Sequence, residues 1–474
     1  MANALVWLRR DLRLTDNTAL QAAIDAGFAP VLVYIHAPEE EKPWQPGAAS
    51  LVWLHYSLQA LKKSIEEKGG RLIIRTGKSL VELEKLIEQT QAEAVFWNRL
   101  YEPACIARDS KVKEVLKQRG IHAESSNGAL LVEPWTIKNL SGDPYRVFTP
   151  FWKNAMQTID NVQPTLAPKQ LPTVPEKIKS ETIDSLNLLP AIKWDRTFWE
   201  FWQPGEAGAL ELLEAFIDGA AIGYKEQRNF PDRIGSSRLS PHLHFGEISP
   251  RQILKAIRQH KWPAKAEADV IHFISELGWR EFSHHLLFHY PHTSNQNLVA
   301  KFDNFNWAKP NPKLLAAWQQ GKTGVPIVDA GMRELWATGW MHNRVRMIVA
   351  SFLCKNLRYH WLEGAQYFWD TLLDADLANN TQGWQWTAGT GADAAPYFRI
   401  FNPVTQAEKF DSQAKYIHQW VPELAKLPAP MAFAPWEHAE LAKRFAPDYP
   451  RKPLIDLKAS REVALSALLA SKNS

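Results

Sequence analysis

Residues 339–386 combine charged, amide and aromatic side chains within a segment that is otherwise apolar. The segment begins GWMHNRVRMIVASFL, passes through LRYHW and ends FWDTLLDADLANNTQGWQW. Its first half, residues 339–361, carries basic side chains and no carboxylate, and its second half adds Asp370, Asp374, Asp376, Asn379 and Asn380. Burying charges and amides is unfavourable unless they are paired, so a cluster of this kind indicates a functional site.

Two arginines lie within a helix that the apolar pattern predicts from about residue 343 to residue 356. Arg344 and Arg346 are two positions apart, roughly 200° around a helix, so they cannot serve the same neighbour. One can pair with a buried acid such as Asp374 while the other faces a cavity or solvent. A structural ion pair beneath a core helix explains these residues equally well.

Length and composition limit the classes of protein. The 474 residues suffice for two or more domains, and a net charge of +4 means that any DNA-binding surface must be a local patch. Two cysteines exclude a disulfide framework or a cysteine metal cage. No apolar run reaches the ~20 residues of a membrane span, and the start shows no signal-peptide pattern, so we expect a cytoplasmic protein without a membrane segment.

Residues 4 to about 130 alternate between strand and helix patterns. The strand candidates ALVWL, VLVYI, RLIIR and AVFWN are separated by helix patterns at about residues 51–68, 80–90 and 107–119, and Asp16 or Asn17 is the N-cap of an earlier helix. This alternation predicts a doubly wound parallel sheet. The first strand–helix turn contains no glycine, which disfavours an NAD-type site, although a small ligand at the carboxyl ends of the strands remains the general expectation.

Residues 131–205 are rich in proline, lysine and polar residues and are predicted to connect two domains. From residue 206 onward helix patterns dominate. Ser240 before Pro241 predicts a helix N-cap, and residues 249–252 predict a capping box. The glycine–serine turn at residues 235–237 can also bind an anion, but two capped helices without a ligand explain it better in isolation.

A helix pattern over residues 269–290 carries Glu276, Trp279 and Ser283 on a stripe apart from its apolar face. A carboxylate beside an indole indicates a binding surface, and a half-buried tryptophan with a wet edge is the simpler alternative. The histidines of this region lack the H-E-x-x-H arrangement, so no metal site is expected. The GKT of WQQGKTGVP lacks the first glycine and the preceding strand of a phosphate-binding loop.

The motifs GWMHNRxRM, LLDADLANN, GWQW and YFRIFNP resemble the flavin-binding region of the photolyase/cryptochrome family, specifically its cyclobutane pyrimidine dimer photolyases. WLRRDLRLTDN and YRVFTPFWKNA extend the resemblance over essentially the whole chain. The resemblance implies an α/β plus all-α fold: a doubly wound parallel-sheet antenna domain at 1–130, a connector at 131–205, and a helical FAD-binding and DNA-lesion domain at 206–474. The implied function is light-driven repair of these dimers in DNA by electron transfer from reduced FAD, carried out by a monomer.

The resemblance also implies roles for individual residues. Positions that contact FAD are matched by Tyr224, Ser236, Ser237, Arg238, Leu239, Ser240, Phe273, Arg346, Asp374, Ala375, Asp376 and Asn380. Positions that contact DNA and the lesion are matched by Arg228, Glu276, Trp279, Arg280, Ser283, Asn343, Arg344, Met347, Trp386 and Arg399. Catalysis and photoreduction are implied for Glu276, Asn380, Trp384, Trp361 and Trp307. Within these sets we expect Arg346 to pair with Asp374, and Asn380 to lie near the flavin N5.

An antenna chromophore is implied for residues 1–130, a methenyltetrahydrofolate rather than a deazaflavin. ACIARD departs from the enterobacterial pattern, which has Asn-Glu at the positions of Ala104 and Cys105, so no antenna contact is assigned. Arg9, Arg10 and Asp11 are expected to tie the two domains together.

Three alternatives to a cyclobutane pyrimidine dimer photolyase are open. Two of them would have other residues at specific positions, and the third is an unrelated kind of protein. A cryptochrome photoreceptor would favour an acid in place of Asn380, a tyrosine in place of Trp386 and often a long tail. A (6-4) photolyase would show His-His at residues 342–343, where this chain has His-Asn. The third is an unrelated helical DNA-binding flavoprotein. REFSHH, VDAGMRELWATGW and FWDTLLDADL resemble the branch nearer plant cryptochromes, so the subclass is left open.

Overall fold

The computed structural model describes residues 1–159 and 162–472. They form two compact units. The first contains Met1–Gly219, Ser237–Pro291 and Leu373–Asp376, and the second contains Ala220–Ser236, His292–Leu372 and Leu377–Ser474. The domain boundaries at residues 130 and 205 stay a prediction; within the predicted domains, residues 160–161 and 473–474 lie outside the described residues.

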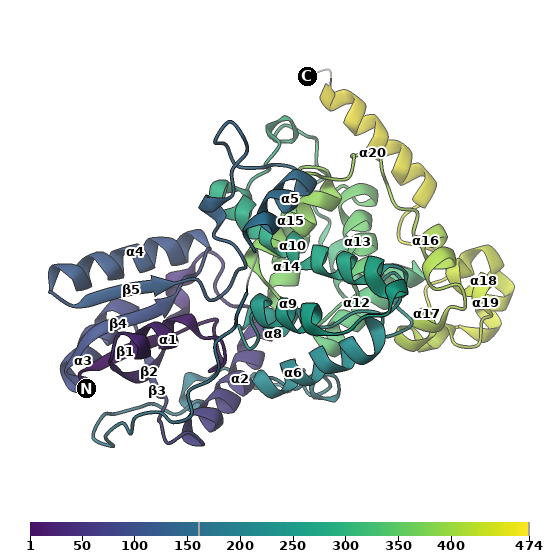
Figure 1. Ribbon diagram of the computed structural model, residues 1–474. Helices are drawn as coiled ribbons and strands as arrows, with labels where there is room; N and C mark the ends of the chain where they lie inside the picture. Colours follow the sequence, from purple (N-terminus) through teal and green to yellow (C-terminus); the bar gives the residue numbers. More distant parts are fainter. Residues whose placement is uncertain (160–161, 473–474) are drawn as a thin grey trace. The chain divides into compact units, whose positions relative to one another are not determined.

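Within the described residues, the sheet of the first unit has five parallel strands in the order β3-β2-β1-β4-β5 (Figure 1). The strands are β1 Asn3–Leu8, β2 Ala29–His36, β3 Ile73–Thr76, β4 Ala92–Asn98 and β5 His122–Ser126. The helices between them are α1 Thr18–Asp25, α2 Ala48–Glu66, α3 Ser79–Thr90 and α4 Pro103–Gln118. The predicted parallel sheet is confirmed. The sequence analysis did not single out β5 because its residues, HAESS, contain no apolar run.

Both faces of the sheet are covered. Leu5, Trp7 and Val33 pack in one cluster with Leu86 of α3 and Leu116 of α4. Side chains alternate along a strand, so Val6 points to the opposite face, where it is also fully buried. A doubly wound fold predicts this burial on both faces, and for the same reason its strands read as continuous apolar runs.

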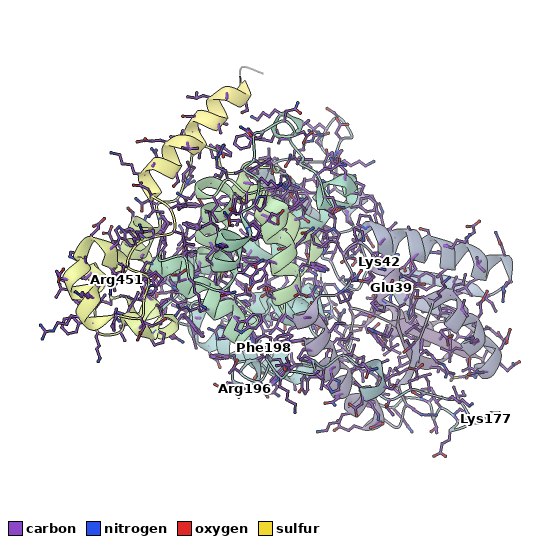
Figure 2. All side chains as sticks on the ribbon, turned by 180° about the vertical axis from the view of Figure 1, so that it is seen from behind. Glu39, Lys42, Lys177, Arg196, Phe198 and Arg451 are labelled. Atoms are coloured by element: carbon purple, nitrogen blue, oxygen red, sulfur yellow. The ribbon has the colours of Figure 1, made fainter. Side chains whose placement is uncertain are left out.

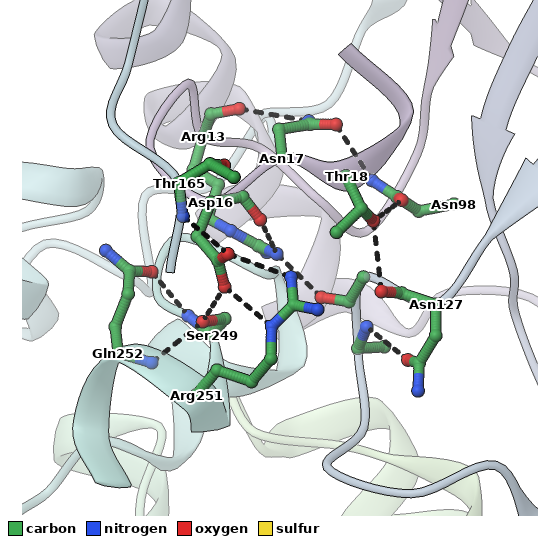
Figure 3. A network of polar contacts seen from close by, with 12 residues as sticks. Arg13, Asp16, Asn17, Thr18, Asn98, Asn127, Thr165, Ser249, Arg251 and Gln252 are labelled. Carbon is green, nitrogen blue, oxygen red and sulfur yellow. Dashed lines mark hydrogen bonds and ion pairs between the residues drawn. The ribbon is translucent and has the colours of Figure 1, made fainter. Parts of the chain in front are cut away.

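The turn after β1 is joined to a segment more than 200 residues later through the buried carboxylate of Asp16 (Figure 3). Asp16 accepts hydrogen bonds from Ser249 Oγ at 2.5 Å and from Arg251 Nε and Nη2 at 3.0 and 2.9 Å. In the same turn Arg13 donates to the carbonyl of Gly246 at 2.8 Å. Asn17 caps α1 by accepting from the amide of Leu20, which settles the choice between the two predicted caps.

The side chains of Arg9, Arg10 and Asp11 pair mainly with nearer groups, and their role in tying the two predicted domains together stays a prediction. Arg9 pairs with Asp109 at 3.1 Å, Arg10 with Glu102 at 2.8 Å, and Asp11 accepts from Asn98 at 2.7 Å. All of these partners belong to the strand-and-helix segment itself. The arginines point back over the ends of the strands because the nearest carboxylates lie there.

The connector contains α5 Phe148–Thr158 and short 3-10 turns between extended, proline-rich stretches. Figure 2 shows Lys177 and Arg196 of this connector at the surface, and Glu39 and Lys42, which form an ion pair in the loop after β2. Beyond residue 205 the described residues form helices and no strand. No described helix combines the length and the apolar character needed to span a bilayer.

The later helices of the first unit are α6 Glu206–Ala215, α8 Ser240–His244, α9 Pro250–Gln259 and α10 Glu267–His289. The helices of the second unit are α7 Tyr224–Gln227, α11 Pro312–Gln319, α12 Pro326–Thr338, α13 Asn343–Ser351, α14 Trp361–Thr371, α15 Leu377–Ala388, α16 Pro403–Phe410, α17 Lys415–Trp420, α18 Ala429–Phe433, α19 Ala439–Phe445 and α20 Leu457–Lys472.

Of the two predicted helix starts, the one at Ser249 is confirmed and the one at Ser240 is wrong by one residue. The capping box is confirmed, since Ser249 Oγ accepts from the amide of Gln252 and the Gln252 side chain accepts from the amide of Ser249. Ser240 is not an N-cap: α8 begins at Ser240, and Leu239 occupies the cap position. Arg238 just before it has a φ of 53°, and this left-handed turn brings the chain into helical geometry one residue earlier than the sequence pattern indicates.

Removal of the Ser249 hydroxyl should destabilise the fold. Ser249→Ala deletes a helix cap and one of the hydrogen bonds to buried Asp16, so we expect the free energy of unfolding to fall by about 1–3 kcal/mol. Urea denaturation followed by circular dichroism measures this change. Ser185→Ala, which removes an exposed hydroxyl of the connector, is the control and should change stability by less than about 0.5 kcal/mol.

Candidate functional site

Helix α13 carries Arg344 and Arg346. It runs over Asn343–Ser351 and continues as a π-helical turn over Phe352–Asn356, which confirms the predicted extent of the helix. Arg344 Nη2 donates to Asn229 Oδ1 at 2.5 Å. Arg346 Nε instead donates to the carbonyl of Met341 at 2.8 Å. The two guanidinium groups therefore serve different neighbours, as predicted.

Arg344 lies at the centre of a positive cluster in the second unit. Burial, followed by repulsion from Arg228 and Arg399, lowers the pKa of Arg344. Its guanidinium carbon lies 4.4 Å from the ring centre of Phe410, and its Nε is buried without a hydrogen-bond partner among the described residues. A buried cation that lies near two other cations is stabilised by a bound polyanion, and planar guanidinium groups suit phosphate oxygens.

Asn343 and Met347 accompany this cluster on α13, and they differ in exposure. Asn343 is exposed and Met347 is half-buried. The sulfur of Met347 lies 3.9 Å from Arg344 Nη1. The helix thus presents an amide and a thioether beside the basic cluster.

Asn380 lies on α15, directly after the buried segment that contains Asp374, Ala375 and Asp376. Its Nδ2 donates to the carbonyl of Ala365 in α14 at 2.9 Å. This bond fixes the orientation of the amide. Asp374 belongs to the first unit, and its pairing with Arg346 stays a prediction.

The three tryptophans predicted to carry electrons are associated with α14. Trp384 is buried and packs so closely on this helix that a Cβ added to Gly364 would lie 2.0 Å from its ring. Trp361 is the first residue of α14 and precedes Gly364 by about one turn. Its side chain is fully buried and donates to Asn297 Oδ1 at 2.9 Å.

Trp307 continues this sequence of rings toward the surface. It is half-buried, and its ring lies 5.3 Å from that of His360, which in turn lies 5.4 Å from the ring of Trp361. Trp384 and Trp361 are therefore both buried at α14, and the ring of His360 lies beside both Trp361 and the partly exposed Trp307. Trp386, two residues after Trp384, is half-buried.

The lesion-contacting residues predicted in the first unit all belong to α10, as do Phe273 and Arg280. The ring of Trp279 stacks on that of Phe148 in α5, with centroids 3.8 Å apart and planes 9° apart. One face of the indole is therefore covered and its orientation is fixed. Glu276 is half-buried, with its carboxylate 3.8 Å from His272 Nε2. Ser283 Oγ donates within the helix to the carbonyl of Trp279 at 2.9 Å.

Arg280 is engaged inside the first unit. Its Nη1 donates to the carbonyl of Ala129 at 2.8 Å and lies 3.4 Å from Glu281 Oε1. Glu281 in turn accepts from the amide of Leu131 at 2.8 Å, and burial raises its pKa to about 7. Contacts of the Arg280 guanidinium group thus join α10 to residues 129–132 within the first unit.

Residues 237–240 form a tight turn before α8. Arg238 is left-handed and Leu239 is right-handed, a succession in which neighbouring backbone N–H groups converge on one point. The chain passes from the second unit to the first between Ser236 and Ser237. Tyr224, also predicted to contact the cofactor, is buried beneath the guanidinium group of Arg228, 5.5 Å from its ring centre. Phe273 is buried against Phe216 at 4.4 Å.

Two histidines beside Asp376 were missed by the sequence analysis. His284 Nε2 lies 3.4 Å and His244 Nδ1 lies 4.0 Å from Asp376 Oδ2. Burial alone would raise the pKa of Asp376, but the two histidines hold it well below its ordinary value. The motif REFSHH was the available signal for His284, but its histidines were considered only as metal ligands and the motif only as a mark of the subclass. The described residues contain no group of three or more His, Cys, Asp or Glu that could hold a metal ion.

The carboxyl ends of β1 and β2, where this fold commonly binds a ligand, are lined by charged side chains. Glu41 lies 3.4 Å from Arg10 and 3.7 Å from Arg108, and Arg10 also lies 3.5 Å from the buried thiol of Cys105. These contacts do not identify a chromophore.

Comparison with known proteins shows similarity along the whole chain. A family described as "DNA photolyase" matches residues 4–175, and one described as "FAD binding domain of DNA photolyase" matches residues 273–470. The deoxyribodipyrimidine photo-lyase of Agrobacterium fabrum is 45% identical over 480 residues, covering 99% of this chain and 98% of that protein. Cryptochrome-1 of Arabidopsis thaliana is 38% identical over 452 residues, covering 92% of this chain and 65% of that protein.

Solved structures agree with the sequence comparison. The crystal structure of a bacterial class III photolyase from Agrobacterium tumefaciens superposes with a TM-score of 0.94 at 45% identity, covering 100% of this chain and 98% of that one. Identity at this level over the full length, together with a shared fold, confirms the family predicted from the sequence motifs. The chain belongs to the photolyase/cryptochrome family.

Proposed function

We propose that this protein repairs cyclobutane pyrimidine dimers in DNA with light and reduced FAD. The observation that carries most weight is Arg344, a partly buried cation held by Asn229 and flanked by Arg228 and Arg399. Cations that repel one another are stabilised when they bind phosphates. Helix α13, which carries Arg344, also presents Asn343 and Met347. These three arginines grip the DNA backbone, and Arg280 contributes only the donors that Ala129 and Glu281 leave over.

The residues present fit a flavin dinucleotide. The backbone N–H groups of residues 236–240 suit a pyrophosphate, and the fixed amide of Asn380 offers its carbonyl oxygen to a ring N–H. Arg346, Asp374 and Asp376 supply charges for the flavin ring. Reduced FAD, when bound, supplies the electron that opens the cyclobutane ring.

The lesion needs aromatic surfaces to replace the stacking that it loses when it leaves the duplex. Trp279, backed by Phe148, offers one indole face, and Trp386 offers a second. Glu276, Asn343 and Met347 contact the edges of the dimer. Extruding two damaged bases costs a few kcal/mol, and stacking at roughly 1–3 kcal/mol per base offsets this cost.

We also propose that the protein is a cytoplasmic monomer and that its antenna is a methenyltetrahydrofolate rather than a deazaflavin. The alternative function is that of a cryptochrome-type photoreceptor, which the identity to Cryptochrome-1 favours. An amide at Asn380 rather than an acid favours repair, because an amide can hydrogen-bond N5 whether or not it is protonated.

The decisive experiment combines spectroscopy with a repair assay. The purified protein should show flavin absorption that bleaches under blue light with a reductant, and it should then restore an oligonucleotide containing one thymine dimer. Flavin absorption and photoreduction without any repair would support the photoreceptor instead. A spectrum without flavin, even after refolding with FAD, would rule out both.

The lesion-binding role of Trp279 can be separated from a structural one. We expect Trp279→Ala to weaken binding to dimer-containing DNA about tenfold or more, because a stacking surface is lost. Affinity for undamaged DNA should hardly change, since phosphate contacts determine it. Trp199→Ala, which removes a half-buried tryptophan of the connector, is the matched control. Filter binding of both DNAs measures the ratio, and an equal loss for both would show that Trp279 is structural.

Photoreduction should depend on Trp384. Trp384→Phe keeps an aromatic ring against Gly364, so we expect the variant to fold, to retain FAD and to repair DNA once reduced chemically. Blue light should no longer reduce its flavin at an appreciable rate, because phenylalanine is much harder to oxidise than tryptophan. Trp202→Phe, at a buried site of the first unit, should photoreduce normally. Normal photoreduction in Trp384→Phe would refute the assignment of the three tryptophans.

A further inference from the structure

Two adjacent histidines on α10 are both buried, but their ring nitrogens face different kinds of group. His285 Nδ1 lies 3.1 Å from the carbonyl oxygen of Pro134, and its Nε2 lies 3.1 Å from the amide nitrogen of Tyr145. A carbonyl requires an N–H, and an amide N–H requires a lone pair. His285 is therefore neutral with its proton on Nδ1, and burial lowers its pKa to about 4.

His284 has the opposite surroundings. Its Nδ1 lies 3.0 Å from the carbonyl oxygen of Arg280, and its Nε2 lies 3.4 Å from Asp376 Oδ2. Both neighbours are acceptors, so both ring nitrogens need a proton, and only the imidazolium form satisfies this geometry. A neutral ring would direct a lone pair at a carbonyl or at a carboxylate in a region from which water is excluded.

The pair formed by His284 and Asp376 is surrounded by charged and titratable groups from each neighbouring element. Arg280 and Glu281 lie on α10 beside His284, His244 approaches Asp376 from α8, the ring of Tyr101 lies 6.3 Å from that of His284, and Arg10 acts on Asp376 from the turn after β1.

Together these groups favour the ion pair between protonated His284 and ionised Asp376. Burial and the neighbouring Arg280 favour the neutral ring, but Asp376 outweighs them and raises the pKa of His284 above its ordinary value. A raised histidine pKa means that the interaction is complete at low pH and is lost as the pH rises through that pKa.

We propose that His284 is a positioning residue for the flavin: as a buried imidazolium it keeps Asp376 ionised and fixed as a hydrogen-bond acceptor for the cofactor. The inference rests on the proposed FAD binding by Asp376. Loss of the His284 proton leaves the buried carboxylate facing a lone pair. The carboxylate then turns away or takes up a proton, and in either case it no longer accepts a hydrogen bond from the cofactor. FAD retention is therefore lost at alkaline pH.

The test measures FAD retained by the holoprotein in the dark, by fluorescence of the released cofactor, from about pH 6 to about pH 10. Wild type should retain FAD at neutral pH and lose it in one step as the pH rises. His284→Gln should bind FAD about tenfold more weakly at neutral pH, without the alkaline step, because a glutamine carries no charge. His284→Arg should bind nearly as well as wild type and also lack the step, because guanidinium stays protonated throughout.

His285→Gln is the matched control, since it changes the neighbouring buried histidine that the geometry assigns as neutral. Its alkaline step should coincide with that of wild type, even if its stability falls. Circular dichroism over the same range separates loss of FAD from unfolding. An unchanged alkaline step in His284→Arg overturns the inference. Equal effects of His284→Gln and His285→Gln also overturn it, because they indicate a purely structural role. Wild type without FAD at any pH would instead refute the proposed function.

Discussion

Several buried charges in the described part of this protein are paired by a distant segment of the chain. An unpaired buried charge costs several kcal/mol, so each one has to be matched before the surrounding core can close. Asp16 is matched by Ser249 and Arg251, and this match holds the turn after β1 against the start of α9. Asp376 is matched in the same way by His284. The backbone around these pairs is positioned by the need to complete them.

Lys355 shows how the second unit meets the same constraint without a carboxylate. It is fully buried in the π-helical turn after α13 and donates to the carbonyls of Ala388 and Tyr397 at 2.8 and 3.2 Å. Its Nζ also lies 3.5 Å from the ring centre of Tyr397, and burial lowers its pKa to about 7. A lysine with two carbonyl acceptors stays satisfied in either protonation state. It anchors the start of the segment that leads from α15 to Arg399.

The proposed chemistry explains which side chains are held rigidly and which are left partly exposed. Electron transfer needs neither a nucleophile nor an acid–base pair, so its demands are on distance and orientation. The tight contact between Trp384 and Gly364 and the stacking of Trp279 on Phe148 both fix an indole against a helix. The arginine cluster is exposed in part, as recognition of an external polyanion requires.

The sequence by itself determined the features that depend on neighbouring residues. The parallel sheet, the capping box at Ser249 and the divergence of Arg344 from Arg346 all follow from local periodicity and side-chain chemistry, and the motifs identified the family. Tertiary structure decided which distant partners meet. It chose Asn17 rather than Asp16 as the cap, joined Arg13 and Asp16 to the segment before α9, started α8 at Ser240 after a left-handed residue, and gave His284 and His285 different hydrogen-bond partners. No local pattern could separate those two histidines, because Asp376 beside His284, and Pro134 and Tyr145 beside His285, come from segments far from α10 in the sequence.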